Sequence, residues 1–262
     1  MDPLLPNRSP EALLRAVIDG PRRALPRLPE TRRIARPGWF QIVTPSMKDG
    51  GMNDIEIEGL EESTADVALD EGISLYRDNG SRFRVFVWPG PHAEPTARRL
   101  EARGLVATTM HGMVRAIDPR ALEAHTLPSI TLDPVDDGSV VPYSETMAAG
   151  WEMDPGPILA MNRKVLADAR ASGDSTTTHW LASVDGVPAA VSASTRFDDV
   201  LYLFGAVVLP KFRGRGLYRA MVARRMVEAH RHGARLATTQ ARAGNLERLG
   251  FATVARISVF RG

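Results

Sequence analysis

A turn rich in arginine and glycine, Arg213-Gly214-Arg215-Gly216, separates an apolar segment at 201–208 from a segment of helical periodicity that begins at Leu217. The first N–H groups of a helix have no partners inside the helix, and the helix dipole places partial positive charge beside them. Because the two glycines have no Cβ, the main chain can approach a bound anion closely. These residue types and their spacing predict an anion site of the kind that binds phosphate groups.

Two common phosphate-binding motifs do not fit this turn. A G-x-G-x-x-G motif would need glycine where Arg219 stands, and a G-x-x-x-x-G-K-[ST] motif occurs nowhere in the chain. An R-x-x-G-x-[GA] pattern fits at two of its three fixed positions, Arg213 and Gly216, and has Tyr218 at the third. The alternative to a phosphate site is a basic surface turn between a strand and a helix.

The turn and its surroundings resemble the acetyl-CoA-binding turn of the GNAT family of N-acetyltransferases. The Val-x-Pro sequence formed by Val208, Leu209 and Pro210 is found before that turn in the family. The patterns at 129–262 predict a strand, two helices, three strands, the turn, a helix, a strand, a short helix and a strand, which is the GNAT order. The resemblance implies an α/β protein whose mixed central sheet is flanked by helices.

The resemblance also implies which residues would bind acetyl-CoA, the acyl donor. Main-chain groups of the apolar strand would hold the pantetheine arm, and those of the turn would hold the pyrophosphate. The family often has a bulge where Gly205 stands, although a glycine inside a strand can also reflect simple packing. The expected binding residues are Ala206, Val207, Val208, Arg213, Gly214, Arg215, Gly216, Leu217 and Tyr218.

No catalytic acid or base can be assigned from the sequence. Many family members carry a tyrosine on the short helix before the Leu-Gly-Phe element, to protonate the leaving thiolate, but Leu246 stands at the matching position. A thiol of ordinary pKa, about 8.5, is a tolerable leaving group without that help. Glu152, Asp154 and Tyr202 are candidates for the base, each with a structural or solvated role as the alternative, and a water chain could serve instead. Trp151 would border the acceptor pocket.

Two helices have predicted limits or faces that can be compared with a structure. The helix that begins near Ser9 is expected to end at Gly20-Pro21. The helix after the turn is expected to bury a broad apolar face that includes Val222 and Met226. Its opposite, solvent-facing side is expected to carry Arg224, Arg225, Glu228 and Arg231.

The chain of 262 residues can form one large domain or two small ones. The segment 100–105, Leu-Glu-Ala-Arg-Gly-Leu, is similar to 246–251, Leu-Glu-Arg-Leu-Gly-Phe, and a strand follows each. This similarity predicts an internal repeat, with two unrelated helix–Gly–strand units as the alternative. We expect a degenerate GNAT-like domain at 1–120 and an acetyl-CoA-binding GNAT domain at 128–262. The first has no R-x-x-G-x-[GA] turn and is not expected to hold acetyl-CoA.

Composition excludes several classes of function. Lys and Arg number 33 against 31 Asp and Glu, and no long basic run exists, so a nucleic-acid partner is not expected. The chain has no cysteine, which excludes disulfides and a thiolate nucleophile, and its histidines have no metal-ligand spacing. No window approaches a membrane span or a secretory signal, so we expect a cytoplasmic protein without metal or membrane.

These observations lead to one expected function and one alternative from another class. The expected function is direct transfer of an acetyl group from acetyl-CoA to a primary amine of a small-molecule or peptide acceptor. The alternative is a non-catalytic acyl-CoA-binding or sensing protein, for which the missing tyrosine and the unassigned base are the reasons. Nucleic-acid binding through the Arg-Gly turn is disfavoured because aromatic residues do not interleave with it. The acceptor and the oligomeric state are left open.

Overall fold

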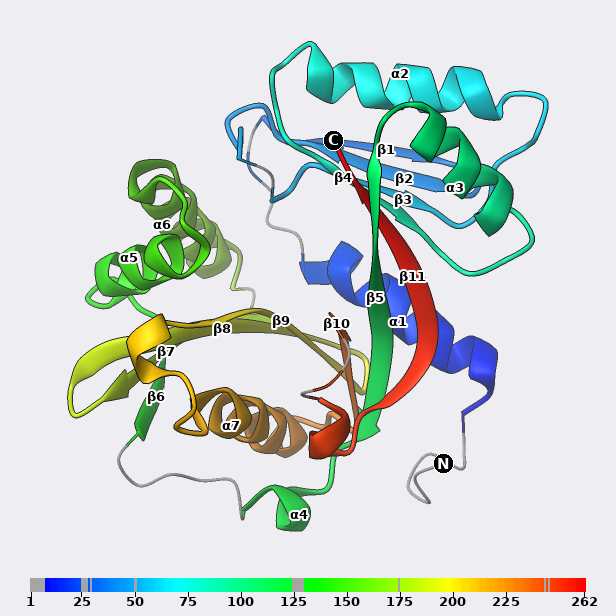
Figure 1. The fold of residues 1–262 in the computed structure, drawn as a ribbon. Coiled ribbons are helices and arrows are strands. Elements are labelled where there is room, and N and C mark those ends of the chain that lie inside the picture. The colour runs from blue at the N-terminus through cyan, green and yellow to red at the C-terminus, as the bar shows by residue number, and fades with distance from the viewer. Residues whose placement is uncertain are drawn as a thin grey trace. The chain divides into compact units, whose positions relative to one another are not determined.

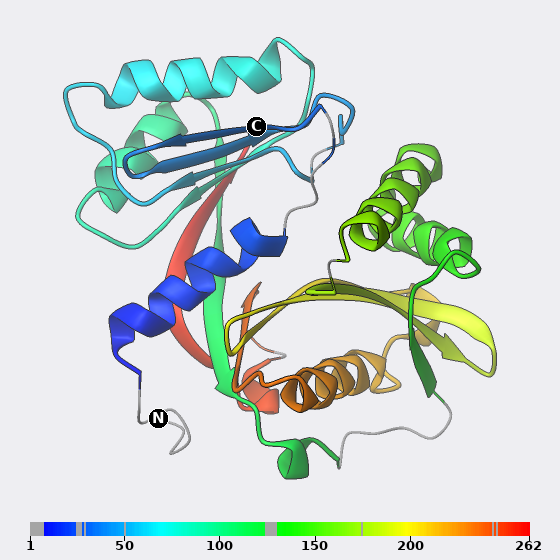
Figure 2. The ribbon, with the colours of Figure 1, turned by 180° about the vertical axis from the view of Figure 1, so that it is seen from behind.

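The computed structural model describes residues 8–24, 28, 30–49, 51–123, 130–173, 175–242, 244 and 246–262. These residues form two compact units, whose elements are labelled in Figure 1 and seen from behind in Figure 2. The first unit comprises the described residues of Met1–Pro26, Met113–Gln240 and Gly244–Val254. The second comprises those of Arg27–Gly112, Ala241–Ala243 and Ala255–Gly262.

The first unit contains the elements predicted for the second half of the chain. Its helices are α1 (Pro10–Ala24), α4 (Pro119–Glu123), α5 (Val140–Trp151), α6 (Pro155–Ser172) and α7 (Leu217–Arg231), with short 3-10 helices η1 (Pro210–Phe212) and η2 (Glu247–Leu249). Its strands are β6 (Ile130–Pro134), β7 (Thr177–Val184), β8 (Val187–Phe197), β9 (Val200–Val208) and β10 (Leu236–Ala241), with parts of β5 (Val106–Ala116) and β11 (Ala252–Arg261). The predicted order of elements from 129 to 262 is confirmed.

The sheet of the first unit has the strand order β6-β7-β8-β9-β10-β5-β11. Neighbouring strands from β6 to β9 are antiparallel, whereas β9 and β10 are parallel. Asp185 and Gly186, both at positive φ, form the tight turn between β7 and β8. The sheet is therefore mixed, strand β9 lies inside it, and the predicted fold class is confirmed.

Helices cover both faces of this sheet. Figures 1 and 2 show α5 and α6 on one side of β7, β8 and β9, and α7 on the other. The apolar cluster beside α5 contains Tyr143, Leu181, Val191 and Val207. The cluster beside α7 contains Ala182, Val184, Ala189, Ala190, Phe212, Leu217 and Met221. Burial of these side chains fixes the end of β9 and the start of α7 in the same core.

Helix α1 runs through Gly20 and Pro21, so the expected end at this pair is wrong. Pro21 has no N–H and leaves the carbonyl of Val17 without its helical partner. Gln240 Nε2 donates to that carbonyl at 3.5 Å. Glycine is needed at position 20, because a Cβ there would lie 2.5 Å from Cδ2 of Tyr202 on β9. Contacts with the sheet thus carry the helix past two residues that usually end one.

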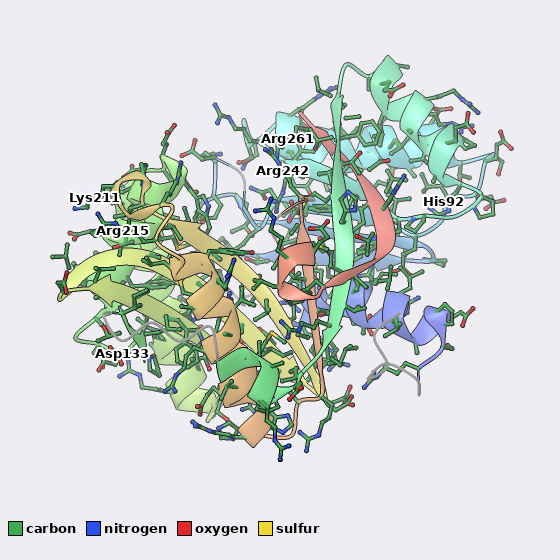
Figure 3. The ribbon with its side chains drawn as sticks, turned by 60° about the horizontal axis from the view of Figure 1, so that its bottom comes forward. His92, Asp133, Lys211, Arg215, Arg242 and Arg261 are labelled. Carbon is green, nitrogen blue, oxygen red and sulfur yellow. The ribbon has the colours of Figure 1, made fainter. Side chains whose placement is uncertain are left out.

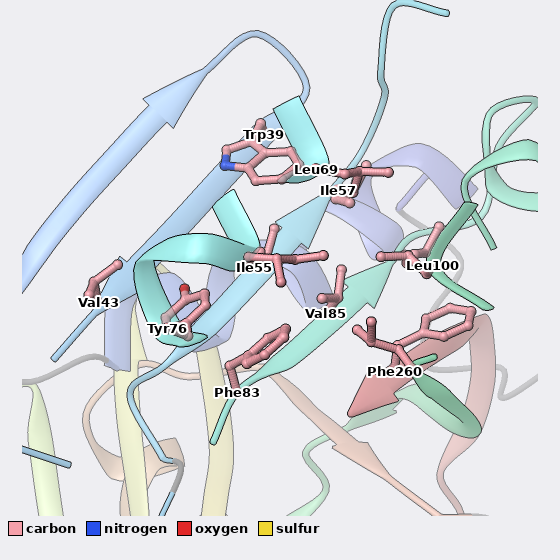
Figure 4. Packing of buried hydrophobic residues seen from close by; sticks show 13 residues of the cluster. Trp39, Val43, Ile55, Ile57, Leu69, Tyr76, Phe83, Val85, Leu100 and Phe260 are labelled. Atoms are coloured by element: carbon pink, nitrogen blue, oxygen red, sulfur yellow. The ribbon is translucent and has the colours of Figure 1, made fainter. Parts of the chain in front are cut away.

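The second unit is a smaller sheet covered by two helices. Its elements are α2 (Ala65–Arg77), α3 (Ala93–Ala102), β1 (Arg32–Arg36), β2 (Trp39–Val43), β3 (Asp54–Ile57) and β4 (Arg84–Val87), with the remaining parts of β5 and β11. Its strand order is β1-β2-β3-β4-β11-β5. Figure 4 shows the core of this unit, in which the rings of Tyr76 and Phe83 stack with their centroids 4.9 Å apart.

Strands β5 and β11 each contribute residues to both units. Each sheet consequently includes a strand segment from the other half of the sequence. Gly104, after α3, and Gly250, after η2, take left-handed φ values of 80° and 77°, as expected of residues that end a helix. The internal repeat and the domains 1–120 and 128–262 stay predictions, because spatial contacts group the residues differently from a single cut in the sequence.

Candidate acyl-CoA site

The leading end of α7 is open. Gly216 is its N-cap residue, with φ 81° and ψ 1°, and no side chain caps the helix. The first main-chain bond of this end runs from Ala220 N to Gly216 O at 3.0 Å. Within the described chain, the N–H groups of Leu217, Tyr218 and Arg219 donate to no residue. The predicted turn residues 213–216 are exposed, so these N–H groups and the helix dipole are available to an anion.

Basic side chains surround this turn. Lys211 Nζ lies 4.9 Å and Arg215 Cζ 5.6 Å from the ring centroid of Phe212, which packs in the core beside α7. Figure 3 labels Lys211 and Arg215 at the loop between β9 and α7. Arg213 Nε donates to Val208 O at 3.1 Å and so ties the turn to the end of β9. No described carboxylate pairs with these three cations, which leaves their charge uncompensated by the protein.

Strand β9 contains the bulge expected at Gly205. In the pairing with β8, Val191 lies opposite Val207 and Ala193 lies opposite Phe204, so β9 has one residue more than β8 between these pairs. Gly205 has a φ of 60°, which favours glycine. Phe204, Gly205 and Ala206 are partly exposed, although most of this central strand is buried. The bulge therefore opens a short stretch of main chain in the middle of the sheet.

The pairing between the parallel strands β9 and β10 ends just before the bulge. Pairing of β9 with β10 extends from Val200 opposite Leu236 to Leu203 opposite Thr239. Thr239 Oγ1 donates to Leu203 O at 2.8 Å and marks the end of the paired stretch. The remaining part of β9, at 204–208, has no described pairing with β10 and holds three of the residues expected to bind the pantetheine arm, Ala206, Val207 and Val208.

The end of α5 borders the bulge. A Cβ on Gly150 would lie 2.6 Å from both methyl groups of Val207, so only glycine lets the helix approach β9 this closely. The next residue, Trp151, is 37% exposed, and its Cη2 lies 3.9 Å from the place that a Cβ on Gly205 would take. The indole therefore borders the opened main chain of β9, where sequence reasoning expected the acceptor.

The three sequence candidates for a base have different surroundings. The carboxylate of Asp154 accepts from Gly156 N at 2.9 Å and is the N-cap of α6. Glu152 is exposed and takes a left-handed φ of 56° at the end of α5. Tyr202 is 7% exposed, and its ring stacks on that of Phe204 with centroids 5.3 Å apart. Asp154 thus has a structural role, whereas Glu152 is exposed and its carboxylate has no partner among the described residues.

The short helix before β11 is the 3-10 helix η2. Element η2 has three residues, and Leu246, its N-cap, is 2% exposed. Leu246 O accepts from Leu249 N at 2.9 Å and from Phe251 N at 3.1 Å. An aliphatic, buried residue therefore occupies the position where many family members have an acidic tyrosine hydroxyl. Asn245, which precedes it, lies outside the described residues.

Sequence reasoning missed one residue of this region, Arg225 on α7. Its expected place on the solvent-facing side is wrong, because the side chain is 2% exposed. Nη1 donates to Ala193 O at 2.7 Å and Nε to Met221 O at 3.0 Å. The spacing from Leu217 through Met221 to Arg225 is four residues at each step, which places Arg225 in line with two core residues. This spacing predicts that position 225 is buried, but a charged residue is usually expected at the surface.

The described part of the chain has neither a metal-binding cluster nor a helix suited to cross a membrane. Among those residues, no three or more His, Asp or Glu side chains gather in a way that could hold a metal ion. The helices described there also include none whose length and apolar character would suit a membrane crossing.

A mixed sheet whose bulged strand leads through a glycine-bearing turn into an open-ended helix is the GNAT fold. Residues 145–252, which run from α5 to the start of β11, match the model of the acetyltransferase (GNAT) family. The members that this model describes are acetyltransferases. A comparison with curated protein sequences finds no match.

Solved structures with the same fold cover almost the whole chain. A GCN5-related N-acetyltransferase from Kribbella flavida is 14% identical, with a TM-score of 0.61 over 96% of this chain and 93% of its own. A tandem GNAT protein from the clavulanic acid biosynthesis pathway is 15% identical, with a TM-score of 0.56 over 94% of this chain and 87% of its own. A functionally unknown conserved protein from Staphylococcus epidermidis ATCC 12228 is 12% identical, with a TM-score of 0.63 over 88% and 94%. At these identities the comparison shows a similar fold and nothing further.

Proposed function

We propose that this protein transfers an acetyl group from acetyl-CoA directly to a primary amine of a small-molecule or peptide acceptor. The observation that carries the proposal is the open leading end of α7: among the described residues, its first N–H groups have no partner and its basic neighbours have no carboxylate partner. A diphosphate brings the negative charge that this end lacks. The bulge in β9 precedes the end of this strand, and the turn follows that end. A pantetheine arm would extend from the turn along the end of β9 to the bulge.

The proposal assigns donor binding to two stretches of main chain. The turn and helix residues Arg213, Gly214, Arg215, Gly216, Leu217 and Tyr218 would hold the pyrophosphate. Ala206, Val207 and Val208, in the part of β9 that has separated from β10, would hold the pantetheine arm. Main-chain binding tolerates side-chain changes, so Tyr218 at a position where a small residue is usual is compatible with it.

In the proposed reaction the neutral amine attacks the thioester carbonyl, and the C–S bond breaks. The attacking nitrogen loses one proton, and the departing thiolate takes one up, so no oxidant, reductant or metal is needed. Main-chain N–H groups at the bulge would stabilise the negative charge that builds on the carbonyl oxygen. Glu152, exposed beside Trp151, can receive the amine proton through water.

Titration calorimetry with acetyl-CoA tests the proposal directly. We expect the parent protein to bind acetyl-CoA and Gly216→Val to lose binding, because a side chain at φ 81° disturbs the turn and fills the space beside the N–H groups. Gly173→Val is the matched control: Gly173 ends α6 at φ 67° with open space around it, so it adds similar backbone strain far from the turn. The proposal would be contradicted if both variants lost binding, or if the parent protein did not bind acetyl-CoA.

The same titration tests where the donor binds. We propose that the domain at 128–262 holds acetyl-CoA and that the domain at 1–120 is a degenerate copy without a phosphate turn. One acetyl-CoA per chain is therefore the expected stoichiometry. Two binding events per chain, of which Gly216→Val removes one, would show that the N-terminal half has kept a donor site.

Leu246 favours a second candidate function, a non-catalytic acyl-CoA-binding or sensing protein. Because this residue is aliphatic and buried, it cannot donate a proton to a leaving thiolate. A panel of alkyl, aryl and peptide amines, with free coenzyme A detected by a thiol reagent, separates the two candidates. Release of coenzyme A with at least one amine supports the transferase, whereas tight binding without turnover on the whole panel supports the sensor.

A further inference from the structure

Arg225 is a buried cation for which the described part of the chain has no counter-anion. Its side chain comes from the middle of α7, is 2% exposed, and forms no ion pair with a described carboxylate. The titratable groups that face it are the phenols of Tyr143 on α5 and Tyr218 on α7. Burial lowers the pKa of Arg225 to about 10, so the guanidinium remains charged at neutral pH. A charge in such surroundings is strongly unfavourable unless its hydrogen bonds compensate for lost water.

The hydrogen bonds of Arg225 converge on the bulge of β9. Nη1 donates to Ala193 O on β8 at 2.7 Å and lies 3.5 Å from Phe204 O on β9. Ala193 and Phe204 are the last pair in register before the bulge, and Gly205 follows at once. Nε donates to Met221 O, which anchors the guanidinium to α7. One side chain thus connects the helix of the phosphate turn to both strands at the point where β9 opens.

The peptide group between Phe204 and Gly205 connects the contact of Arg225 with the proposed acyl transfer. Its oxygen faces the guanidinium, and its N–H belongs to Gly205, the first bulged residue. A cation near a peptide oxygen polarises the whole peptide unit and strengthens its N–H as a donor. The charge also raises the electrostatic potential on the stretch of β9 that faces the acyl group in the proposed reaction.

Packing alone does not explain an arginine at this position. The neighbours of Arg225 along the same line of α7 are Leu217 and Met221, both in the apolar cluster that α7 forms with the sheet. An aliphatic side chain would continue that cluster without the cost of taking a charge out of water. Packing in the cluster therefore does not account for the guanidinium, whereas its hydrogen bonds to the two strands and to α7 do.

We propose that Arg225 is a positioning residue for acyl transfer: it fixes the bulged main chain of β9 and keeps it polarised toward the thioester carbonyl. This inference rests on the proposed function, and it assigns to Arg225 an effect on the bound acyl group that is separate from affinity for coenzyme A. The carbonyl group of bound acetyl-CoA reports on that effect without any knowledge of the acceptor.

Isotope-edited infrared spectroscopy of acetyl-CoA labelled with ¹³C at the carbonyl provides the test. In the parent protein we expect the carbonyl stretch of bound acetyl-CoA to lie below that of free acetyl-CoA, because hydrogen bonds weaken the C=O bond. In Arg225→Met we expect most of this difference to be lost, with coenzyme A affinity within about threefold of the parent. Turnover of an amine should fall at least about tenfold at an unchanged KM for acetyl-CoA.

Two companion variants make the outcome decisive. Arg224→Met removes the same charge from the adjacent, exposed residue of α7 and should leave the carbonyl stretch as in the parent. Arg225→Lys keeps a charge but cannot bond to α7 and both strands at once, so an intermediate stretch is expected, and this variant decides the question if Arg225→Met does not fold. A parental stretch in either variant of Arg225 would overturn the proposal. Absence of acetyl-CoA binding in the parent would instead overturn the proposed function first.

Discussion

At the scale of single residues, Ser192 stands out beside the bulge. It is fully buried on β8, and its Oγ has no hydrogen-bond partner among the described residues. An unsatisfied buried hydroxyl destabilises a protein by about 1–3 kcal/mol, so we expect Ser192→Ala to raise the free energy of unfolding by about 1 kcal/mol. Urea denaturation measures this change, and coenzyme A affinity should stay unchanged.

Ser194 provides the matched control for this substitution. It lies two residues further along β8, is also buried, and its Oγ accepts from Trp180 Nε1 at 3.3 Å. Ser194→Ala leaves the indole N–H without that partner and is expected to lower the free energy of unfolding by about 1 kcal/mol. If Ser192→Ala destabilised the protein to the same degree, the Ser192 hydroxyl would have to form a hydrogen bond, for example with a buried water. The polar groups beside the bulge would then have more hydrogen-bond partners than the described residues provide.

At the scale of elements, the close approach of α5 to β9 determines where Trp151 lies. We expect Gly150→Ala to lower the free energy of unfolding by about 1–3 kcal/mol, because its Cβ would lie 2.6 Å from the methyl groups of Val207 and push the helix away. Val207→Ala removes these methyl groups, so the double variant should recover part of the loss. A double-mutant cycle by urea denaturation measures the coupling, and additive effects would contradict this account.

Local signals in the sequence were sufficient for most elements of the first unit. The glycine in β9 and the Arg-Gly turn before α7 each depend on residues adjacent in the chain, and the structure has both features at the predicted places. Arg225 and the course of α1 depend instead on partners far along the chain. Ala193 O satisfies the guanidinium, and Gln240 supports the helix beyond its proline, so local periodicity could not predict either.

At the scale of the whole molecule, strands β5 and β11 limit what a sequence can reveal about domains. Their central residues change from one unit to the other at Met113 and Ala255; Gly112 precedes the first of these, but neither place has a proline or a polar linker to mark a boundary. Sequence signals for boundaries depend on such linkers, and the boundary expected between residues 120 and 128 lies after β5. The candidate site was predictable because its turn is contiguous, whereas the composition of each sheet depends on pairing between distant strands.

The pH dependence of stability is also a property of the whole molecule, and His179 is expected to contribute to it. Its side chain is half-buried on β7, with the ring edge-on to Tyr143 at a centroid distance of 5.7 Å, and the loss of water around the ring lowers its pKa from 6.5 to about 4. Between these two pH values the unfolded chain binds a proton that the folded protein does not, so stability decreases as the pH falls from 6.5 toward 4. At about 1.4 kcal/mol per pKa unit the full loss is about 3 kcal/mol.

We expect His179→Phe to remove this part of the pH dependence, because phenylalanine keeps a ring against Tyr143 and takes up no proton. Free energies of unfolding from urea denaturation at about pH 7.5 and about pH 5 measure the difference for the parent and the variant. The parent should lose more stability than the variant over this interval, and both should respond equally above the pKa of an exposed histidine. Equal losses in the acidic interval would mean that the folded protein takes up a proton at His179 as readily as the unfolded chain does, which would contradict the lowered pKa.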